Sequence, residues 1–254
     1  YPESALVIGL YLVDFLDDIN AGQADDKLDQ LLDTLAGYER PVYLRFGYEF
    51  DGSWNHYDPE EFKAAWIRFH DRMTDRGVDN VAMVWQSATA CPGTYGQRPI
   101  RAWYPGDAYV DWVGLSFFVQ LNCRLEPIRE AIDFARERGK PVMIAESTPQ
   151  RYAIEDLTFS LYGRTFEART PEQIWLEWYA PFFTYIFQNR DVIRAVAYIN
   201  ADWNAQPMWG PPYLNSYWGD SRVEVNPFIA ARWRVVLDDE EWLQGSPALV
   251  ALPE

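Results

Sequence analysis

Short apolar segments alternate with amphipathic segments along the chain, and this alternation predicts strands separated by helices. The expected strands span residues 5–12, 41–48, 80–87, 110–118, 141–146 and 193–200. The first is almost continuously apolar, a pattern typical of a strand that is buried on both faces of a parallel sheet. Nothing in the pattern predicts antiparallel hairpins.

Between the strands, apolar residues recur at the spacing of helices. Helices are expected around residues 28–36, 58–76, 127–138, 170–180 and 228–237. Asp58 and Thr170 are each followed by a proline, which combines an N-cap with a first-turn proline at the start of two of these helices. Pro181 is expected to kink or end the second of them. Residues 147–169 are expected to form a long loop that is rich in polar and aromatic residues.

Strands that are each followed by a loop or helix form a parallel α/β sheet, either a closed barrel or an open doubly wound sheet. Two features favour the (β/α)8 TIM barrel. Candidate catalytic groups follow the C-terminal ends of several strands, as in barrel enzymes, and no glycine-rich phosphate loop opens a helix. A complete barrel needs eight strands, whereas six are clear in this chain.

Composition and charge limit the possible partners. The 254 residues are enough for one large domain and few for two. A net charge of -16 argues against nucleic acid as a partner, and no apolar run approaches the roughly 20 residues of a membrane span. Aromatic residues make up 17% of the chain, more than its core needs, so some are expected to line a cleft for a neutral substrate.

The cysteines and histidines do not indicate a metal or a cofactor. Cys91 and Cys123 are the only cysteines, and no thiol or histidine cluster has the spacing of metal ligands. The two cysteines follow neighbouring strands of the expected barrel. Their loops would lie on one face, which allows a disulfide, with Cα atoms roughly 4.4–6.8 Å apart, or two free thiols.

Two glutamates come at the ends of expected strands, and they are the candidate catalytic residues. Glu49 and Glu146 would meet on one face of a parallel barrel, and retaining glycosidases need two carboxyl groups about 5–5.5 Å apart. Strand alternation places Arg45 and Glu49 on one face and Tyr48 on the other. Arg45 is expected to hold the geometry of the carboxyl pair, to serve as an ion-pair partner inside the barrel, or to do both.

Residues 45–49 and 52–54 resemble the R-x-x-H-E-x-N-G-x-W segment of glycoside hydrolase family 26. Further matches in register occur at 84–85, 104–114 and 141–146, so the resemblance spans about residues 40–147. It implies a retaining β-glycosidase in which Glu49 is the acid/base and Glu146 is the nucleophile. The implied substrate is a β-linked polysaccharide, in first place a β-mannan, with β-1,3-xylan and mixed-linkage glucan as alternatives.

The same resemblance numbers the strands, because the family's acid/base ends strand 4 and its nucleophile ends strand 7. The expected strands at 41, 80, 110 and 141 then count as four to seven. On this count the chain begins near strand 3 and lacks the first two β/α units. We expect a single catalytic barrel domain, residues 1–254, that is incomplete at its N-terminus because sequence is missing, rather than one completed by another chain. An extracellular location is also expected.

Three departures from the family pattern leave a second function open. Tyr48 stands in place of a histidine, Asp51 in place of an asparagine, and Ser116-x-Phe118 in place of Asp-x-Tyr. That tyrosine normally hydrogen-bonds the nucleophile, so Glu146 needs another partner. A carbohydrate-binding barrel that has kept the cleft and lost turnover is therefore the alternative to an enzyme.

Aromatic and polar residues in the loops after strands are the candidate contacts with sugar rings. Each of the aromatic residues is also compatible with packing under a loop, while His56 is suited to hydrogen-bond a sugar hydroxyl. Trp203 is favoured because clan members place an aromatic residue after strand 8. The candidate substrate-binding residues are Arg45, Tyr48, Asp51, Trp54, His56, Tyr57, Trp85, Trp103, Phe118 and Trp203.

Overall fold

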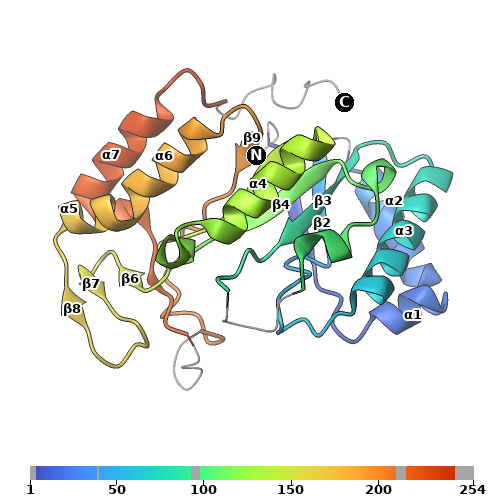
Figure 1. Cartoon of the computed structure of the whole chain (residues 1–254), viewed down its shortest axis with the longest axis horizontal. Helices are drawn as coiled ribbons and strands as arrows, with labels where there is room; N and C mark the ends of the chain where they lie inside the picture. Colours follow the sequence, from blue (N-terminus) through green and yellow to red (C-terminus); the bar gives the residue numbers. More distant parts are fainter. Residues whose placement is uncertain (1–3, 39, 93–97, 210–215, 244–254) are drawn as a thin grey trace.

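The computed structural model describes residues 4–38, 40–92, 98–209 and 216–243. All six expected strands are present, and they form one parallel sheet in which every strand pairs with the next one along the chain. Figure 1 shows this sheet with helices packed around it. In sheet order, the strands are β1 (Leu6–Leu10), β2 (Val42–Phe46), β3 (Val81–Ser87), β4 (Trp112–Phe117), β5 (Val142–Ser147) and β9 (Ile193–Val196).

The expected helices are also present, and the residues predicted to cap two of them form the expected hydrogen bonds. The Asp58 carboxylate accepts the backbone N–H of Glu60 at the start of its helix, and Thr170 forms a capping box with Gln173. No helix among the described residues is long and apolar enough to cross a membrane. The helices are α1 (Leu16–Asn20), α2 (Asp25–Ala36), α3 (Pro59–Asp75), α4 (Glu126–Arg138), α5 (Pro171–Ile174), α6 (Ala180–Gln188) and α7 (Pro227–Leu237).

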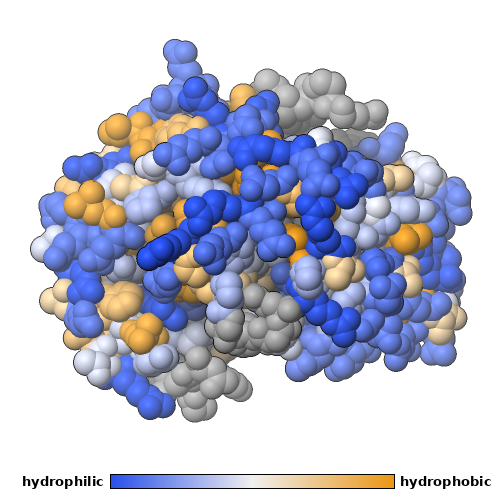
Figure 2. Space-filling view, viewed as in Figure 1, coloured by the Kyte–Doolittle hydropathy of each residue, from blue (hydrophilic) through white to orange (hydrophobic). Residues whose placement is uncertain are grey.

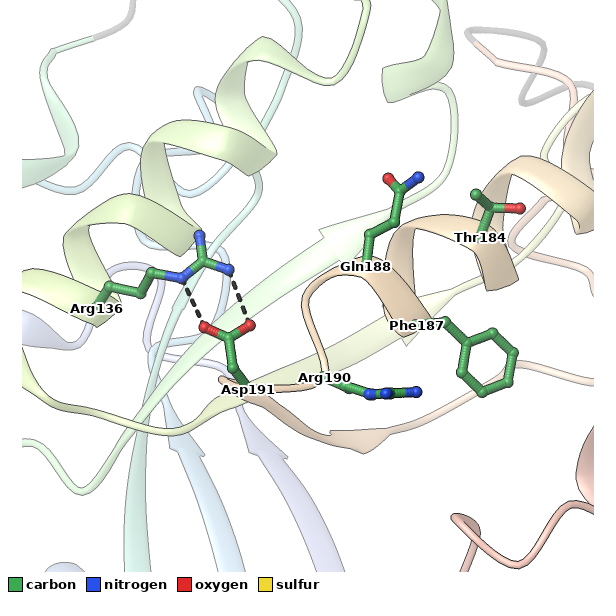
Figure 3. A pocket seen from close by; sticks show the side chains of 6 residues that line it. All are labelled: Arg136, Thr184, Phe187, Gln188, Arg190 and Asp191. Carbon is green, nitrogen blue, oxygen red and sulfur yellow. Dashed lines mark hydrogen bonds and ion pairs between the residues drawn. The ribbon is translucent and has the colours of Figure 1, made fainter.

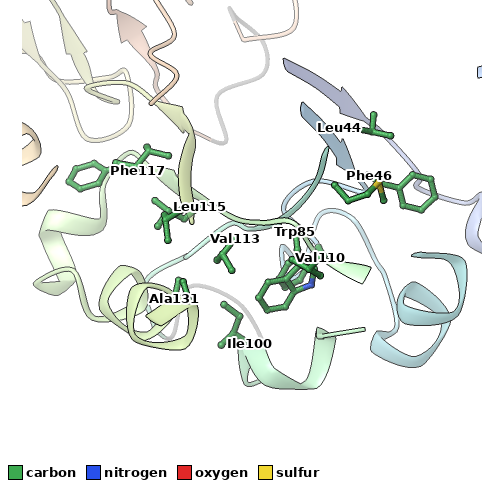
Figure 4. Close-up of a cluster of buried hydrophobic side chains, with 14 of the residues drawn as sticks. Leu44, Phe46, Trp85, Ile100, Val110, Val113, Leu115, Phe117 and Ala131 are labelled. Atoms are coloured by element: carbon green, nitrogen blue, oxygen red, sulfur yellow. The ribbon is translucent and has the colours of Figure 1, made fainter. Parts of the chain in front are cut away.

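The core lies between the sheet and the helices that cover it. Alternate residues of β4, such as Val113 and Leu115, are fully buried and face the helix layer together with Ala131 of α4 (Figure 4). Phe46 of β2 stacks on Phe69 of α3 with ring centroids 4.5 Å apart. One face of the strands therefore points outward to the helices, as in a β/α barrel. The opposite face carries a smaller apolar cluster of Val84, Met143 and Ala145, and polar side chains such as Arg45 and Gln86.

β1 differs from its expected burial. It lies at an edge of the sheet, and among the described residues only β2 pairs with it. Its burial consequently alternates, and Val7 is 39% exposed. The prediction of a strand covered on both faces was wrong because an apolar run does not tell whether a neighbouring strand is present.

The helical segment around Pro181 does not end there. A π-helical turn, Trp175–Tyr179, joins α5 directly to α6, and Pro181 lies in the first turn of α6. The wider π turn changes the hydrogen-bond pattern just before the proline, so its missing N–H and its ring are accommodated. The segment continues for two more turns and supplies Phe182 and Phe183 to the core.

The expected long loop before this segment contains a second, smaller sheet. β6 (Tyr152–Ala153), β7 (Thr158–Phe159) and β8 (Glu167–Ala168) are antiparallel neighbours, and β10 (Gly219–Asp220) pairs with β6. The sequence pattern contained no sign of antiparallel hairpins, whereas the structure has antiparallel strands here. Strands of two residues are too short to produce a recognisable alternation of apolar and polar positions.

The two cysteines form a disulfide. Cys91 and Cys123 are bonded, with Cα atoms 5.7 Å apart, which decides between the two alternatives left by the sequence. The bond connects the segment after β3 to the segment after β4, at the C-terminal ends of the strands.

Candidate active site

Glu49 and Glu146 belong to one network of side chains at the C-terminal ends of the strands. The Ser116 hydroxyl on β4 donates a 2.7 Å hydrogen bond to Oε1 of Glu49. Ser116 is also the register partner of Glu146 across the β4–β5 pair. The two carboxyl groups that were predicted from strand ends are therefore neighbours in space, although 97 positions separate them in the chain.

Arg45 on β2 is the ion-pair partner of Glu146. Its Nη1 contacts Oε1 of Glu146 and donates a 3.0 Å hydrogen bond to Oε1 of Gln86. Side chains that point inward from different strands at the same height meet in a barrel, which explains why Arg45 reaches across to β5. The arginine is thus the partner that Glu146 was expected to need.

The segment that carries Glu49 is bent sharply. Gly47 and Glu49 have φ angles of +61° and +52°, in the region that is strained for any residue with a Cβ atom. A Cβ on Gly47 would come within 2.9 Å of the Phe62 ring. The buried side chain of Asn55 holds the bend, because its Nδ2 donates to the carbonyls of Tyr48 and Glu49 at 3.0 and 2.8 Å. The sequence analysis missed Asn55.

The bend also corrects the position of Tyr48. Period-two alternation placed its ring on the outer face with Phe46, but β2 ends at Phe46 and the positive φ of Gly47 reverses the alternation. The Tyr48 ring lies 5.3 Å from the Arg45 guanidinium, on the same side as the carboxyl groups. Tyr48 therefore stays a candidate contact with substrate.

The two carboxyl groups have different electrostatic surroundings. Glu49 is 9% exposed, and burial, followed by the negative charge of Glu146, raises its pKa to about 8. The hydrogen bond from Ser116 and the charge of Arg45 oppose this rise. Glu49 is consequently protonated at neutral pH, while Glu146 has a cation in direct contact. One carboxyl group is suited to donate a proton and the other to act as an anion.

Asp51 and Tyr57 both have hydrogen-bond partners within the protein, and their contact with substrate stays a prediction. The Asp51 carboxylate accepts hydrogen bonds from the Ser87 hydroxyl at 2.6 Å and from the Ala88 N–H at 2.7 Å. The Tyr57 hydroxyl accepts the N–H of Leu12 at 3.0 Å. Both side chains connect the bent segment to residues at the ends of neighbouring strands. A sequence motif does not distinguish this structural role from ligand binding.

Trp85 and Trp103 are core residues, contrary to the sequence-based prediction. They are 0% and 5% exposed, and the Trp85 indole N–H donates to the Trp103 carbonyl at 3.1 Å. Their rings lie 4.5 and 5.5 Å from the ring of Phe50. Trp85 lies among the apolar side chains next to the helices (Figure 4). Trp85 lies within β3 and Trp103 ends a short 3-10 helix after it, and burial in the core leaves neither ring free to contact a sugar.

Trp54 and His56 remain on the surface of the bent segment. Trp54 is 40% exposed, and its ring covers Gly52 so closely that a Cβ there would lie 2.4 Å from a ring atom. His56 is exposed and has a φ of +55°. Both keep the orientation toward solvent that a sugar contact requires.

Three tryptophans gather in the segment after β9, and we call Trp203, Trp209 and Trp218 the tryptophan cluster. Trp218 lies 4.8 Å from Trp203 and 5.1 Å from Trp209 between ring centroids. It also contacts Phe118 edge to face at 5.0 Å, two residues beyond Ser116. The sequence analysis named Phe118 and Trp203 as candidates but missed Trp218, for which the repeated tryptophans of this segment were the available signal.

Tyr11 is a second residue that the sequence analysis missed. It follows β1, its side chain is 59% exposed, and its ring centroid lies 6.3 Å from that of Tyr48. Its position just after a strand was the available signal, because the other candidate site residues also lie at or just after the ends of strands. Tyr11, which is exposed, and the tryptophan cluster, which is half-buried, thus place aromatic rings near both edges of the sheet.

A surface hollow between α4 and α6 is not part of this site. Arg136, Arg190 and Asp191 line it, and Asp191 precedes β9, so the hollow lies at the N-terminal ends of the strands. Its charges are already paired, Arg136 with Asp191 (Figure 3) and Arg190 with Glu241. Hydrophilic side chains predominate on the face shown in Figure 2, and the apolar ones form small separate patches.

Comparison with protein families identifies relatives. Residues 14–159 match the model of glycosyl hydrolase family 26. The chain is 42% identical over 255 residues to the β-1,3-xylanase TXYA of a Vibrio species and 41% identical to a β-1,3-xylanase of an Alcaligenes species. Both matches cover 99% of this chain but 55% and 54% of the relatives, so the chain spans about half of their length.

Solved structures share the fold. An endo-β-1,4-mannanase of Cellulomonas fimi superposes with a TM-score of 0.62 at 18% identity, over 95% of this chain and 55% of its own. A β-mannanase of Bacteroides ovatus superposes with a TM-score of 0.57 at 15% identity, over 91% of this chain and 63% of its own. At these identities the similarity concerns the fold alone, and it confirms the β/α-barrel class predicted from the sequence.

Proposed function

Because this chain belongs to glycosyl hydrolase family 26, we propose that it carries the catalytic site of a retaining β-glycoside hydrolase. Glu49 is the general acid/base and Glu146 is the nucleophile. The observation that supports this most strongly is the contrast between the two carboxyl groups, since Glu49 is buried with a raised pKa and Glu146 is paired with Arg45. Double displacement needs one carboxyl group in each of these two states.

In the first step, Glu49 donates its proton to the oxygen of the leaving sugar while the Glu146 carboxylate attacks the anomeric carbon. The glycosidic C–O bond breaks, and a covalent ester forms between the sugar and Glu146. Arg45 pairs with Glu146 and orients it before the attack. Its second contact, with Gln86, limits the motion of the guanidinium and so preorganises the nucleophile.

In the second step, Glu49 removes a proton from water, which attacks the anomeric carbon and releases the sugar with its original configuration. The negative charge of Glu146 is the second-largest cause of the raised Glu49 pKa, and esterification removes that charge. The pKa of Glu49 therefore falls once the intermediate has formed, which favours its action as a base.

We propose β-1,3-xylan as the substrate. Two relatives that match along 99% of this chain are β-1,3-xylanases by name, which supports the alternative that the sequence analysis placed after mannan. β-Mannan stays an untested prediction. Release of reducing sugar from β-1,3-xylan, β-mannan and mixed-linkage glucan separates these substrates. Tight binding of oligosaccharides without any release would instead support the carbohydrate-binding barrel.

The tryptophan cluster is expected to bind a sugar ring beside the scissile bond. Trp218→Ala should raise KM for β-1,3-xylan by about 3- to 10-fold, because an aromatic contact contributes about 0.5–1.5 kcal/mol. Tyr38→Ala is a control, since Tyr38 is 39% exposed and precedes β2 at the opposite ends of the strands. Initial rates over a range of substrate concentrations give both KM values. Equal KM values in the two variants would remove Trp218 from the substrate site.

A further inference from the structure

We infer that Gln86 and Ser116 are positioning residues that form a directional hydrogen-bond relay from Arg45 to Glu49. The relay makes Oε1 of Glu49 a permanent acceptor and leaves Oε2 as the oxygen that carries the catalytic proton. The inference rests on the proposed function in so far as it assigns this proton a catalytic use. It assigns Ser116 a role that the two-step reaction above does not use, and gives Gln86 a second role beside its contact with Arg45.

The direction of the relay begins with Arg45. A guanidinium has only hydrogen-bond donors, so the atom of Gln86 that faces Arg45 Nη1 at 3.0 Å is its oxygen, Oε1. The amide nitrogen of Gln86 must then point the other way. It donates to the Ser116 hydroxyl oxygen at 3.1 Å. The arginine therefore settles the orientation of an amide that would otherwise be ambiguous.

Ser116 passes this direction on to Glu49. Its hydroxyl has a single hydrogen, and the bond from Gln86 Nε2 occupies an acceptor position of the oxygen. The hydrogen is donated to Oε1 of Glu49 at 2.7 Å. Gln86 and Ser116 are 1% and 0% exposed, so water does not compete for either bond.

The consequence concerns the two oxygens of Glu49. An oxygen that accepts the Ser116 hydrogen is disfavoured as the site of the acidic proton, because a proton on Oε1 would point at a hydroxyl that is already donating to it. The proton is placed on Oε2, which turns a symmetrical carboxyl group into an oriented donor. The same bond stabilises the carboxylate after the proton has left.

The relay also connects the two catalytic carboxyl groups. Arg45 Nη1 contacts both Gln86 and Glu146, so one cation pairs with the nucleophile and orients the acid through two neutral side chains. A shift of the guanidinium would disturb both groups together. We therefore expect the effects of substitutions along the relay to be less than additive.

The test compares Ser116→Ala, Gln86→Met and the double variant in the full protein. Removal of a hydrogen bond to the charged form raises the pKa of Glu49, by about one unit for a charge-assisted bond. The basic limb of the pH profile of kcat/KM should move upward by that amount in Ser116→Ala and by less in Gln86→Met. The double variant should move no further than Ser116→Ala, and Ser116→Thr should restore the original profile.

Thr89→Val is the matched control. The Thr89 hydroxyl is buried beside the relay and donates to the backbone carbonyl of Ser116 at 2.6 Å, so its loss tests for local disturbance without removing a bond to Glu49. Thr89→Val should leave the pH profile in place. An unmoved profile in Ser116→Ala, or a uniform loss of activity at every pH, would overturn the relay.

A titration that needs no turnover separates this inference from the proposed function. ¹³C NMR of carboxyl-labelled glutamate follows the protonation of Glu49 directly in each folded variant. A raised Glu49 pKa in Ser116→Ala, found in a protein that hydrolyses none of the three glycans, would support the relay and contradict the proposed function. Active enzyme whose Glu49 titration does not change between wild type and Ser116→Ala would contradict the relay alone.

Discussion

Glu146→Gln should lower kcat/KM for β-1,3-xylan by a factor on the order of 10⁴ or more. Glutamine has nearly the same shape and keeps an oxygen toward Arg45, so the fold and the ion-pair site are little disturbed. Its amide does not attack the anomeric carbon, and the covalent intermediate is not formed. Initial rates with the variant and the wild type provide the comparison.

Glu137→Gln is the control for the loss of an ion-paired carboxylate. Glu137 lies on α4 and pairs with Arg101 at the surface, and this substitution should leave the rate unchanged. Azide added to Glu146→Ala should attack the sugar from the vacated side and give the α-glycosyl azide from an activated β-glycoside. Residual activity within tenfold of the wild type in Glu146→Gln would exclude Glu146 as the nucleophile.

Glu49→Ala should lower hydrolysis of unactivated β-1,3-xylan by about 10²- to 10⁴-fold, the range of general acid/base catalysis. An aryl glycoside with a good leaving group does not need the proton, so its first step should survive and the glycosyl-enzyme should accumulate. Azide should then restore turnover and give the β-glycosyl azide, because it attacks the intermediate from the side that Glu49 occupied.

The pH dependence of the wild type follows from the same residue. Glu49 must be protonated for the first step, and its pKa is raised to about 8 by burial and by the charge of Glu146. kcat/KM should therefore stay constant through neutral pH and decrease as the pH rises through about 8. This basic limb should be absent when Glu49→Ala acts on the activated glycoside. A limb at the same pH in the variant would assign the titration to another group.

The strands and the proximity of Glu49 to Glu146 were predictable from the sequence because their signals are local. Continuous apolar runs identify the strands, and Asp58 with Pro59 identifies the start of α3. Glu49 and Glu146 follow because parallel strands bring their C-terminal ends together. These inferences need only the order of the elements along the chain and the spacing of apolar residues, and folding changes neither.

The parts that were not predictable depend on side-chain direction. Trp85 looks like a ligand contact at the end of a strand, but it points into the core. Tyr48 was placed on the wrong face because a single positive φ at Gly47 reverses the alternation. Arg45 is close to Glu49 in sequence and yet pairs with Glu146, since contacts across a barrel depend on the height of a residue along its strand.

The anomeric configuration of the first product tests the central claim most directly. If Glu146 attacks the anomeric carbon and water later displaces it, two inversions restore the original configuration. ¹H NMR spectra recorded during the first minutes of hydrolysis of a β-1,3-xylooligosaccharide, before mutarotation, should show the β-anomer. First appearance of the α-anomer would contradict the account, because it requires a single displacement by water with no covalent intermediate on Glu146.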